Sequence, residues 1–251
     1  MRQRIQLGHV PIDRLTFAGA LDAIEALVDG GRGGTVLTPN VDHVVVAESH
    51  EGLRAAYRDA DLSLVDGMPL LWAARLLGTP LPEKISGSDL VLPLMQRAAE
   101  RGWKVYLLGA GPGVAEEAAV ILRRDAGVNI VGTDAPRLSS EPDPAVDGPV
   151  AERIRASGAQ VVLVAFGAPK QELWMNRMKT SLAPAVMLGI GASLDFIAGR
   201  VPRAPGWMSR SGLEWLYRLT REPKRLWRRY LVNDPQFVAV LLRDLRRGRS
   251  R

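Results

Sequence analysis

Short runs of β-branched and apolar residues alternate with stretches of helical spacing along most of this chain, and this alternation constrains its fold more than any other feature. The apolar runs predict strands, and the stretches between them predict helices. Strands that alternate with helices form a mainly parallel sheet covered on both faces. We therefore predict an α/β fold with a Rossmann-like parallel sheet, preceded by a hairpin-like segment. The expected strands are 34–38, 61–65, 103–108, 128–132, 160–166 and 185–190.

The character of the sequence changes near residue 205. Residues 205–251 hold twelve basic and four acidic residues, a net charge of +8 in a chain whose total is +6. Helical patterns over 207–220, 224–232 and 235–247 combine arginines with aromatic residues. Such helices lie in membrane interfaces, but composition fits equally well a solvated basic face whose aromatics pack on the body. We predict an α/β catalytic domain over 1–204 and a basic, aromatic-rich helical appendage over 205–251, which would bind an anionic partner.

Several classes of protein are disfavoured by what the sequence lacks. It has no cysteine, so disulfides and thiolate chemistry are excluded, and a reducing cytosol suits it. The N-terminus does not look like a signal peptide, and we find no run of about 18 apolar residues. The three histidines show no metal-binding spacing. Asp59-Ala60-Asp61 matches a metal-diphosphate motif but precedes a strand, the wrong end for a site, so we expect no metal.

Two turns that follow expected strands are candidates for a catalytic pocket. They are Thr38-Pro39-Asn40 and Asp66-Gly67. In an open α/β sheet, ligands bind beyond the carboxyl ends of the strands. A carboxylate at that place can take a proton from a bound alcohol. The alternative is that Asn40 and Asp66 only form turns or cap helices, and residue types alone favour it.

Other loops offer weaker candidates for ligand binding. Gly109-Ala110-Gly111-Pro112-Gly113 lies between a strand and a helix, where free amides could bind phosphate. It matches neither the dinucleotide fingerprint nor the P-loop, and an ordinary tight turn fits as well. Lys84 and Gln171 lie in loops that contain Gly and Pro, where sites tend to occur. Gln171 could instead cap its helix, and Asp195, after the last strand, could be a buried cap.

An ordered set of motifs resembles the WecG/TagA/CpsF family of bacterial glycosyltransferases over nearly the full chain. The most specific strings are Gly167-Ala168-Pro169-Lys170-Gln171-Glu172 and Arg203-Ala204-Pro205 followed by Gly212-Leu213-Glu214-Trp215. The resemblance implies an inverting transferase that moves a sugar from a UDP-sugar to an undecaprenyl-diphosphate-linked sugar, in teichoic acid or exopolysaccharide synthesis. It implies a peripheral enzyme at the cytoplasmic face of the membrane, without a cofactor or metal. A homo-oligomer is possible, and no nucleic acid partner is expected.

The resemblance also assigns roles to residues. Asp66 would be the general base, with Thr38 and Asn40 lining its pocket. Gln171 would hold the donor or the acceptor. The remaining assignments are nucleotide binding by Asp195, Gly109, Gly111 and Gly113, and diphosphate binding at the membrane by Arg218, Arg225 and Arg228.

The chain departs from the family pattern at two places, and these leave the donor sugar open. Lys84, also a substrate-binding candidate, stands where the family usually has Arg, so a bidentate phosphate contact would become a point charge. The loop 133–149 lacks the aromatic string expected there. N-acetylmannosamine, its uronic acid and another hexose are all compatible with the sequence. Two other functions are considered: a nucleotide- or nucleic-acid-binding module that uses the basic tail, and an NAD-dependent oxidoreductase, disfavoured because no true glycine fingerprint is present.

Overall fold

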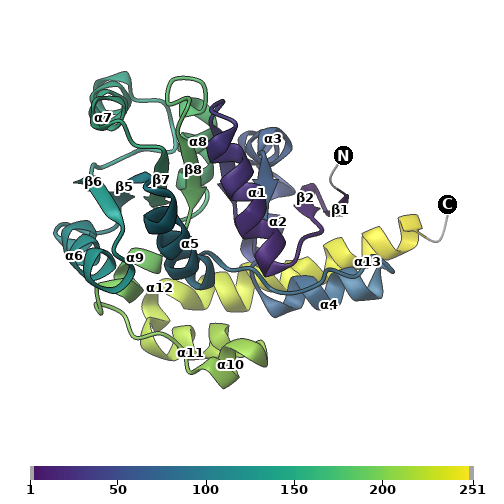
Figure 1. Ribbon diagram of the computed structural model, residues 1–251. Helices are drawn as coiled ribbons and strands as arrows, with labels where there is room; N and C mark the ends of the chain where they lie inside the picture. Colours follow the sequence, from purple (N-terminus) through teal and green to yellow (C-terminus); the bar gives the residue numbers. More distant parts are fainter. Residues whose placement is uncertain (1–2, 249–251) are drawn as a thin grey trace.

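The computed structural model describes residues 3–248, which contain a six-stranded parallel sheet in the order β4-β3-β8-β7-β5-β6 (Figure 1). A two-stranded antiparallel hairpin, β1 (Arg4–Leu7) and β2 (Val10–Asp13), precedes it. The predicted α/β fold is therefore confirmed, although β4 is shorter than expected. The strands of the sheet are β3 (Gly34–Leu37), β4 (Leu62–Ser63), β5 (Lys104–Gly109), β6 (Asn129–Asp134), β7 (Val161–Ala165) and β8 (Val186–Gly189).

Helices cover both faces of the sheet, as the alternating pattern predicted (Figure 1). One face carries α1 (Phe17–Asp29), α5 (Gly87–Arg101), α6 (Val114–Ala126) and α9 (Ser193–Ile197). The other face carries α2 (Val41–Ala47), α3 (Glu51–Asp59), α4 (Met68–Leu76), α7 (Pro144–Ser157) and α8 (Lys170–Met178). Helix α7 begins five residues before the predicted 149–157, because Asp143 caps it and Pro144 occupies its first turn.

The structure corrects the predicted helices beyond residue 205. The expected helix 207–220 is two helices, α10 (Gly206–Arg210) and α11 (Glu214–Arg221), because Gly212 adopts a φ of 75° between them. The expected helices 224–232 and 235–247 instead form one nearly continuous helical segment. Pro235 lacks an amide hydrogen, and irregular turns interrupt the α-helix there. The segment consists of α12 (Pro223–Arg228), a π-turn (Arg229–Asn233), a 3-10 turn (Asp234–Gln236) and α13 (Phe237–Gly248).

This C-terminal segment packs against the body. Helix α13 contacts α2 and β1, and Phe237 and Val240 belong to the buried core. The amide of Gly8 donates a hydrogen bond to Asp244 Oδ2 over 2.7 Å. The division of the chain into domains at residue 205 stays a prediction, and Arg249 and Arg251 of the basic tail lie outside the described residues. Within residues 3–248, no helix has the length and apolar character needed to cross a bilayer.

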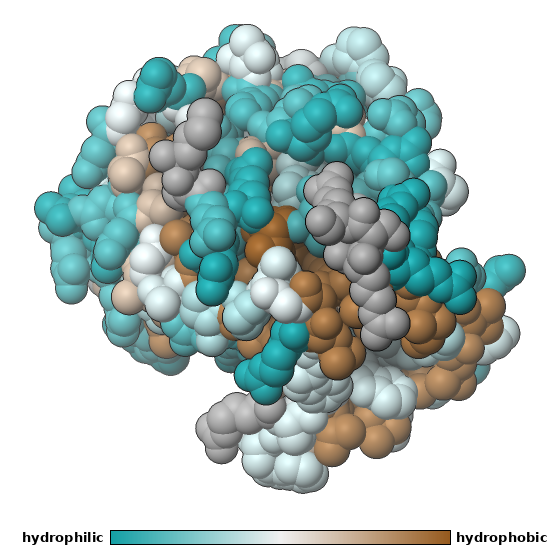
Figure 2. Space-filling model, turned by 90° about the vertical axis from the view of Figure 1, so that its right-hand side faces the viewer, coloured by the Kyte–Doolittle hydropathy of each residue, from teal (hydrophilic) through white to brown (hydrophobic). Residues whose placement is uncertain are grey.

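Large apolar side chains remain exposed on the C-terminal segment and on α4. Figure 2 shows a hydrophobic band along the lower part of the molecule, below a mostly hydrophilic surface. Four of the exposed large apolar side chains of the C-terminal segment are distributed along it, one on α12, one on the π-turn and two on α13. They are Trp227, Leu231, Val238 and Leu242.

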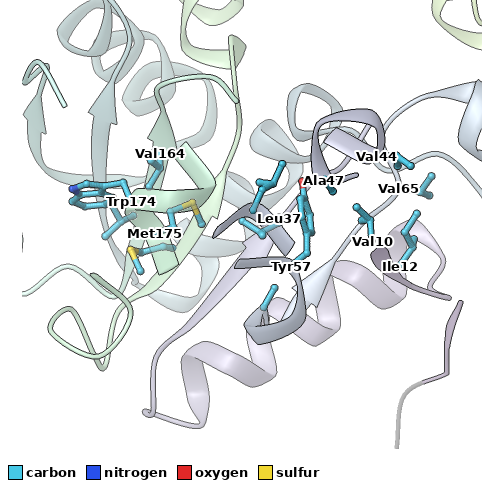
Figure 3. Close-up of a cluster of buried hydrophobic side chains, with 14 of the residues drawn as sticks. Val10, Ile12, Leu37, Val44, Ala47, Tyr57, Val65, Val164, Trp174 and Met175 are labelled. Carbon is cyan, nitrogen blue, oxygen red and sulfur yellow. The ribbon is translucent and has the colours of Figure 1, made fainter. Parts of the chain in front are cut away.

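Alternating side chains of the sheet enter two separate hydrophobic clusters. Val161 and Leu163 of β7 face the α1 side, whereas Val162 and Val164 face the α8 side. All five residues of β7 are buried, as expected for a central parallel strand. Figure 3 shows part of the α8-side cluster, where Trp174 lies near the strands. This packing fixes the carboxyl ends of the strands, where the candidate site lies.

Candidate active site

The carboxyl ends of β3 and β4 and the C-terminal helices enclose a cavity of about 280 Å³. The sheet side contributes the two predicted turns, and α10, α11 and the π-turn form the opposite wall. The sequence analysis predicted the first wall, but of the second it named only Arg218, as a diphosphate-binding residue. The polar side chains that line the cavity are Asn40, Asp66, Lys84, Ser209, Glu214, Arg218, Arg229, Tyr230 and Asp234.

Backbone contacts bring the two turns together. The amide of Asp66 donates to the carbonyl of Pro39 over 2.8 Å. Asn40 caps α2, because its Oδ1 accepts from the amide of Asp42 at 3.1 Å, and it also lines the cavity. Gly67, not Asp66, is the N-cap of α4, and no side chain caps that helix. The capping alternative therefore describes Asn40 but not Asp66.

The surroundings of Asp66 favour its neutral form. Burial raises the pKa of Asp66 to about 6, and the nearby charge of Glu214 adds to the rise. Lys84, His43 and Arg218 act in the opposite direction. A carboxyl with a pKa near neutrality is a better proton acceptor than an ordinary aspartate, yet it is still ionised at pH 7. Asp66 can therefore act as a general base.

Three cationic side chains lie around the cavity. Lys84 Nζ is 2.8 Å from Asp89 Oδ2 and donates to Ser209 Oγ at 2.9 Å. Arg229 Nη2 donates to Asn40 Oδ1 at 2.9 Å. Arg218 lines the cavity as well. A guanidinium group can donate two parallel hydrogen bonds to phosphate oxygens, so Arg218 and Arg229 can hold a diphosphate in this cavity.

Comparison with known proteins identifies the family of this chain. The model of the Glycosyl transferase WecG/TagA/CpsF family matches residues 5–251. The chain belongs to this family. A similar protein is the N-acetylglucosaminyldiphosphoundecaprenol N-acetyl-beta-D-mannosaminyltransferase of Bacillus spizizenii (strain ATCC 23059 / NRRL B-14472 / W23). The two are 31% identical over 242 residues, which cover 96% of this chain and 90% of that enzyme. The resemblance noted in the sequence is thus confirmed, and the chain is a glycosyltransferase.

Some predicted residues of this WecG/TagA/CpsF protein do not line the cavity. Thr38 is buried, and its hydroxyl donates to the carbonyl of Gly189 at 3.1 Å. Gln171 is also buried: its Oε1 accepts from the amide of Gly191 at 3.1 Å, and its Nε2 donates to Glu172 Oε1 at 3.0 Å. Both side chains therefore join β3, α8 and the turn after β8 beneath the site.

The predicted nucleotide-binding residues lie elsewhere on the same edge of the sheet. Helix α9, which carries Asp195, packs on α6, and the Gly109–Gly113 turn precedes α6. Gly109 has a φ of 108°, and a Cβ atom there would approach the carbonyl oxygen of Ala165 to 2.6 Å. Gly109 therefore allows β5 and β7 to meet. Around Gly111 and Gly113 an added Cβ would meet no tight contact.

The two remaining predicted arginines lie outside the cavity wall. Arg225 forms an ion pair with Glu222; burial raises the pKa of Asp195, and the charge of Arg225 lowers it. Arg228 is exposed. Among residues 3–248, no group of three or more His, Asp or Glu side chains is placed to hold a metal ion. Asp61 of the predicted D-x-D motif lies before β4 and pairs with Lys179 at 2.8 Å.

Sequence reasoning missed three charged residues of the cavity. Glu214 belongs to the Gly212–Trp215 string, but nothing in the string indicates that it faces Asp66. Arg229 is one of many arginines in the tail, and Asp234 precedes a proline, a pattern typical of a cap. Asp234 Oδ1 is buried without a hydrogen-bond partner among the described residues, and burial raises its pKa to about 6, opposed by Arg229.

Proposed function

We propose that this protein is an inverting glycosyltransferase that moves a sugar from a UDP-sugar to an undecaprenyl-diphosphate-linked sugar. The observation that carries the proposal is the raised pKa of Asp66 in a cavity lined by Lys84, Arg218 and Arg229. The name of the Bacillus spizizenii relative states what that enzyme transfers and to what: an N-acetyl-mannosaminyl group, to N-acetylglucosaminyl-diphosphoundecaprenol. N-acetylmannosamine is therefore the proposed sugar, with teichoic acid or exopolysaccharide synthesis as the pathway class. Membership of this family disfavours a nucleic-acid-binding module.

The proposed reaction is a single displacement. The carboxylate of Asp66 takes the proton of the acceptor hydroxyl as its oxygen attacks the anomeric carbon. The bond from that carbon to UDP breaks on the opposite face, so the configuration inverts and UDP leaves with the electron pair. Arg218, Lys84 and Arg229 neutralise the negative charge that develops on the diphosphate of the departing UDP, because cations fixed near a leaving group stabilise such charge. The Gly109–Gly113 turn and Asp195 are proposed to hold the nucleotide.

A substrate panel tests this function. The full-length chain is incubated with UDP-sugars, each with and without a short-chain polyprenyl-diphosphate-N-acetylglucosamine acceptor, and UDP release is followed. We expect release that requires both substrates and is fastest with UDP-N-acetylmannosamine. Absence of acceptor-dependent release with every donor would overturn the proposal, whereas fastest release with another donor would change only the sugar.

The pH dependence of transfer follows from the pKa of Asp66. Because the base must be ionised, we expect kcat/KM to fall about tenfold per pH unit below pH 6. In Glu214→Gln a negative charge that raises this pKa is lost, so the fall should begin at lower pH. Rates measured across the acidic range check this, with Glu51→Gln, an exposed carboxylate of α3, as the control. If the fall of kcat/KM in Glu214→Gln begins at the same pH as in the wild type, or at a higher pH, the role of Glu214 is contradicted.

Transfer is proposed to need no metal ion, because Lys84 and the arginines supply the positive charge that a metal would provide. We expect the same turnover after dialysis against excess EDTA as before it. The assay is UDP release with the preferred donor, with Mg²⁺ or Mn²⁺ added back in a parallel sample. A loss of turnover that either cation restores would show that the diphosphate requires a metal.

We further propose that the protein works at the cytoplasmic face of the bacterial membrane, bound to its surface. An undecaprenyl-linked acceptor resides in that membrane. The exposed Trp227 and Leu231 lie on a segment that also carries the exposed Lys224 and Arg228. Apolar side chains beside basic ones suit an anionic lipid interface.

A further inference from the structure

A buried chain of polar side chains runs from the cavity to the turn after β8. It starts at Asn40, whose backbone amide donates to His43 Nδ1 at 3.2 Å and whose Oδ1 lies 2.9 Å from the same nitrogen. His43 Nε2 lies 3.3 Å from Glu172 Oε1. The same oxygen accepts from Gln171 Nε2 at 3.0 Å, and Gln171 Oε1 accepts from the amide of Gly191 at 3.1 Å. The chain thus joins the cavity to the turn that leads into α9.

Its members are almost inaccessible to solvent. The exposed fractions are 6% for His43, 3% for Gln171 and 1% for Glu172. Burial alone would raise the pKa of Glu172, but the neighbouring His43 and its hydrogen bonds hold the pKa below its usual value. Tyr57 packs edge-on against His43, with ring centroids 6.0 Å apart. Glu172 is therefore held in its ionised form, and Tyr57 helps to fix the orientation of the His43 ring.

The stability of the fold does not explain why a carboxylate is buried at position 172. Glu172 Oε2 is buried and has no hydrogen-bond partner among the described residues. A buried carboxylate, even with a partner, usually stabilises a fold no better than an apolar side chain of the same volume, and an unsatisfied oxygen makes it worse. Asp147 offers a contrast, because both of its oxygens are engaged, one by Trp174 of the same helix α8 and the other by Arg177.

We infer that His43 and Glu172 are positioning residues, which hold Asn40 at the cavity and, through Gln171, the Gly189–Gly191 turn in one fixed arrangement. A side chain at Gly189 would clash with the side-chain amide of Gln171, so the turn packs directly against Gln171. The inference rests on the proposed function. An acceptor near Asn40 and a donor near α9 must meet in line, and a displacement of about 1 Å can lower the rate about 100-fold.

A double-mutant cycle between Asn40 and Glu172 tests this, because His43 lies between the two side chains and contacts both. We expect Glu172→Gln to lower kcat/KM about 100-fold in the wild-type background. In the Asn40→Ala background the same change should cost much less than about 100-fold, because the side-chain contact between Asn40 and His43 is already lost and only the link to the Gly189–Gly191 turn remains. If Glu172→Gln does not fold, His43→Gln breaks the chain one link nearer to Asn40 and is used in the same cycle.

Asp147→Asn is the matched control, a buried carboxylate partnered by α8 residues but outside the chain. Its effect on kcat/KM should be the same in the wild-type and Asn40→Ala backgrounds. Equal losses from Glu172→Gln in both backgrounds would overturn the inference and leave Glu172 a structural residue. The wild type is measured in parallel: absence of its turnover would refute the proposed function, whereas normal turnover with an additive cycle would refute only the positioning role.

Discussion

Asp66→Asn should lose about 1000-fold in kcat while it keeps its fold and its affinity for UDP. Asparagine has the same shape as aspartate but cannot accept a proton at neutral pH, and a positioned general base contributes about 100- to 10,000-fold. The charge of Asp66 is unfavourable to folding at neutral pH, as its raised pKa of about 6 indicates, so its removal should not lower the melting temperature. Steady-state kinetics, thermal unfolding and a UDP-induced thermal shift measure the three properties.

Asp59→Asn provides the matched control for this substitution. Asp59 ends α3 at the opposite edge of the sheet and makes its ion pair with Arg58. Its kcat should remain within about twofold of wild type, as expected for a surface change away from the cavity. Wild-type turnover in Asp66→Asn would remove Asp66 from the mechanism. Equal losses in both variants would point to a general effect on the fold.

A variant with Trp227, Leu231, Val238 and Leu242 all changed to Gln should fail to bind vesicles that contain anionic lipid. These side chains are exposed along the C-terminal segment. Partial burial of each in an interface contributes about 1 kcal/mol, so losing four weakens binding about 1000-fold. Vesicle pelleting measures the loss. Transfer to a short-chain, water-soluble acceptor should persist, because none of the four lines the cavity.

Leu92→Gln/Val120→Gln controls for a general change in surface hydropathy. Both side chains are exposed, on α5 and α6, away from the C-terminal segment. This variant should pellet with vesicles as the wild type does. Unchanged pelleting of the fourfold variant would refute the membrane contact of the C-terminal segment. Substitution is a sharper test than truncation after residue 205, which would also remove Phe237 and Val240 from the core.

The parts of the site that depend on local sequence were predictable. The apolar runs place Asn40 and Asp66 after neighbouring strands, and parallel strands bring their carboxyl ends to one edge. The backbone bond between Asp66 and Pro39 then joins the turns. The strand pattern was sufficient for this, because β3 and β4 are buried along their whole length.

The second wall of the cavity was not predictable from local patterns. Arg229 meets Asn40 across 189 positions of the chain, and no spacing rule applies over that distance. The same holds for Lys84 and Ser209, which are 125 positions apart. Gln171 illustrates a different limit. A polar residue in a Gly/Pro loop suggests exposure, but tertiary packing turned this side chain inward to partner Glu172 and Gly191.

A crystal structure with UDP and a short-chain lipid-diphosphate acceptor tests most directly whether Asp66 is the base that activates the acceptor. The acceptor hydroxyl should lie about 3 Å from the Asp66 carboxylate, with the diphosphate against Arg218, Lys84 or Arg229 and the nucleotide along the same edge of the sheet. A nucleotide bound at the opposite edge of the sheet, beyond the reach of residue 66, would contradict this.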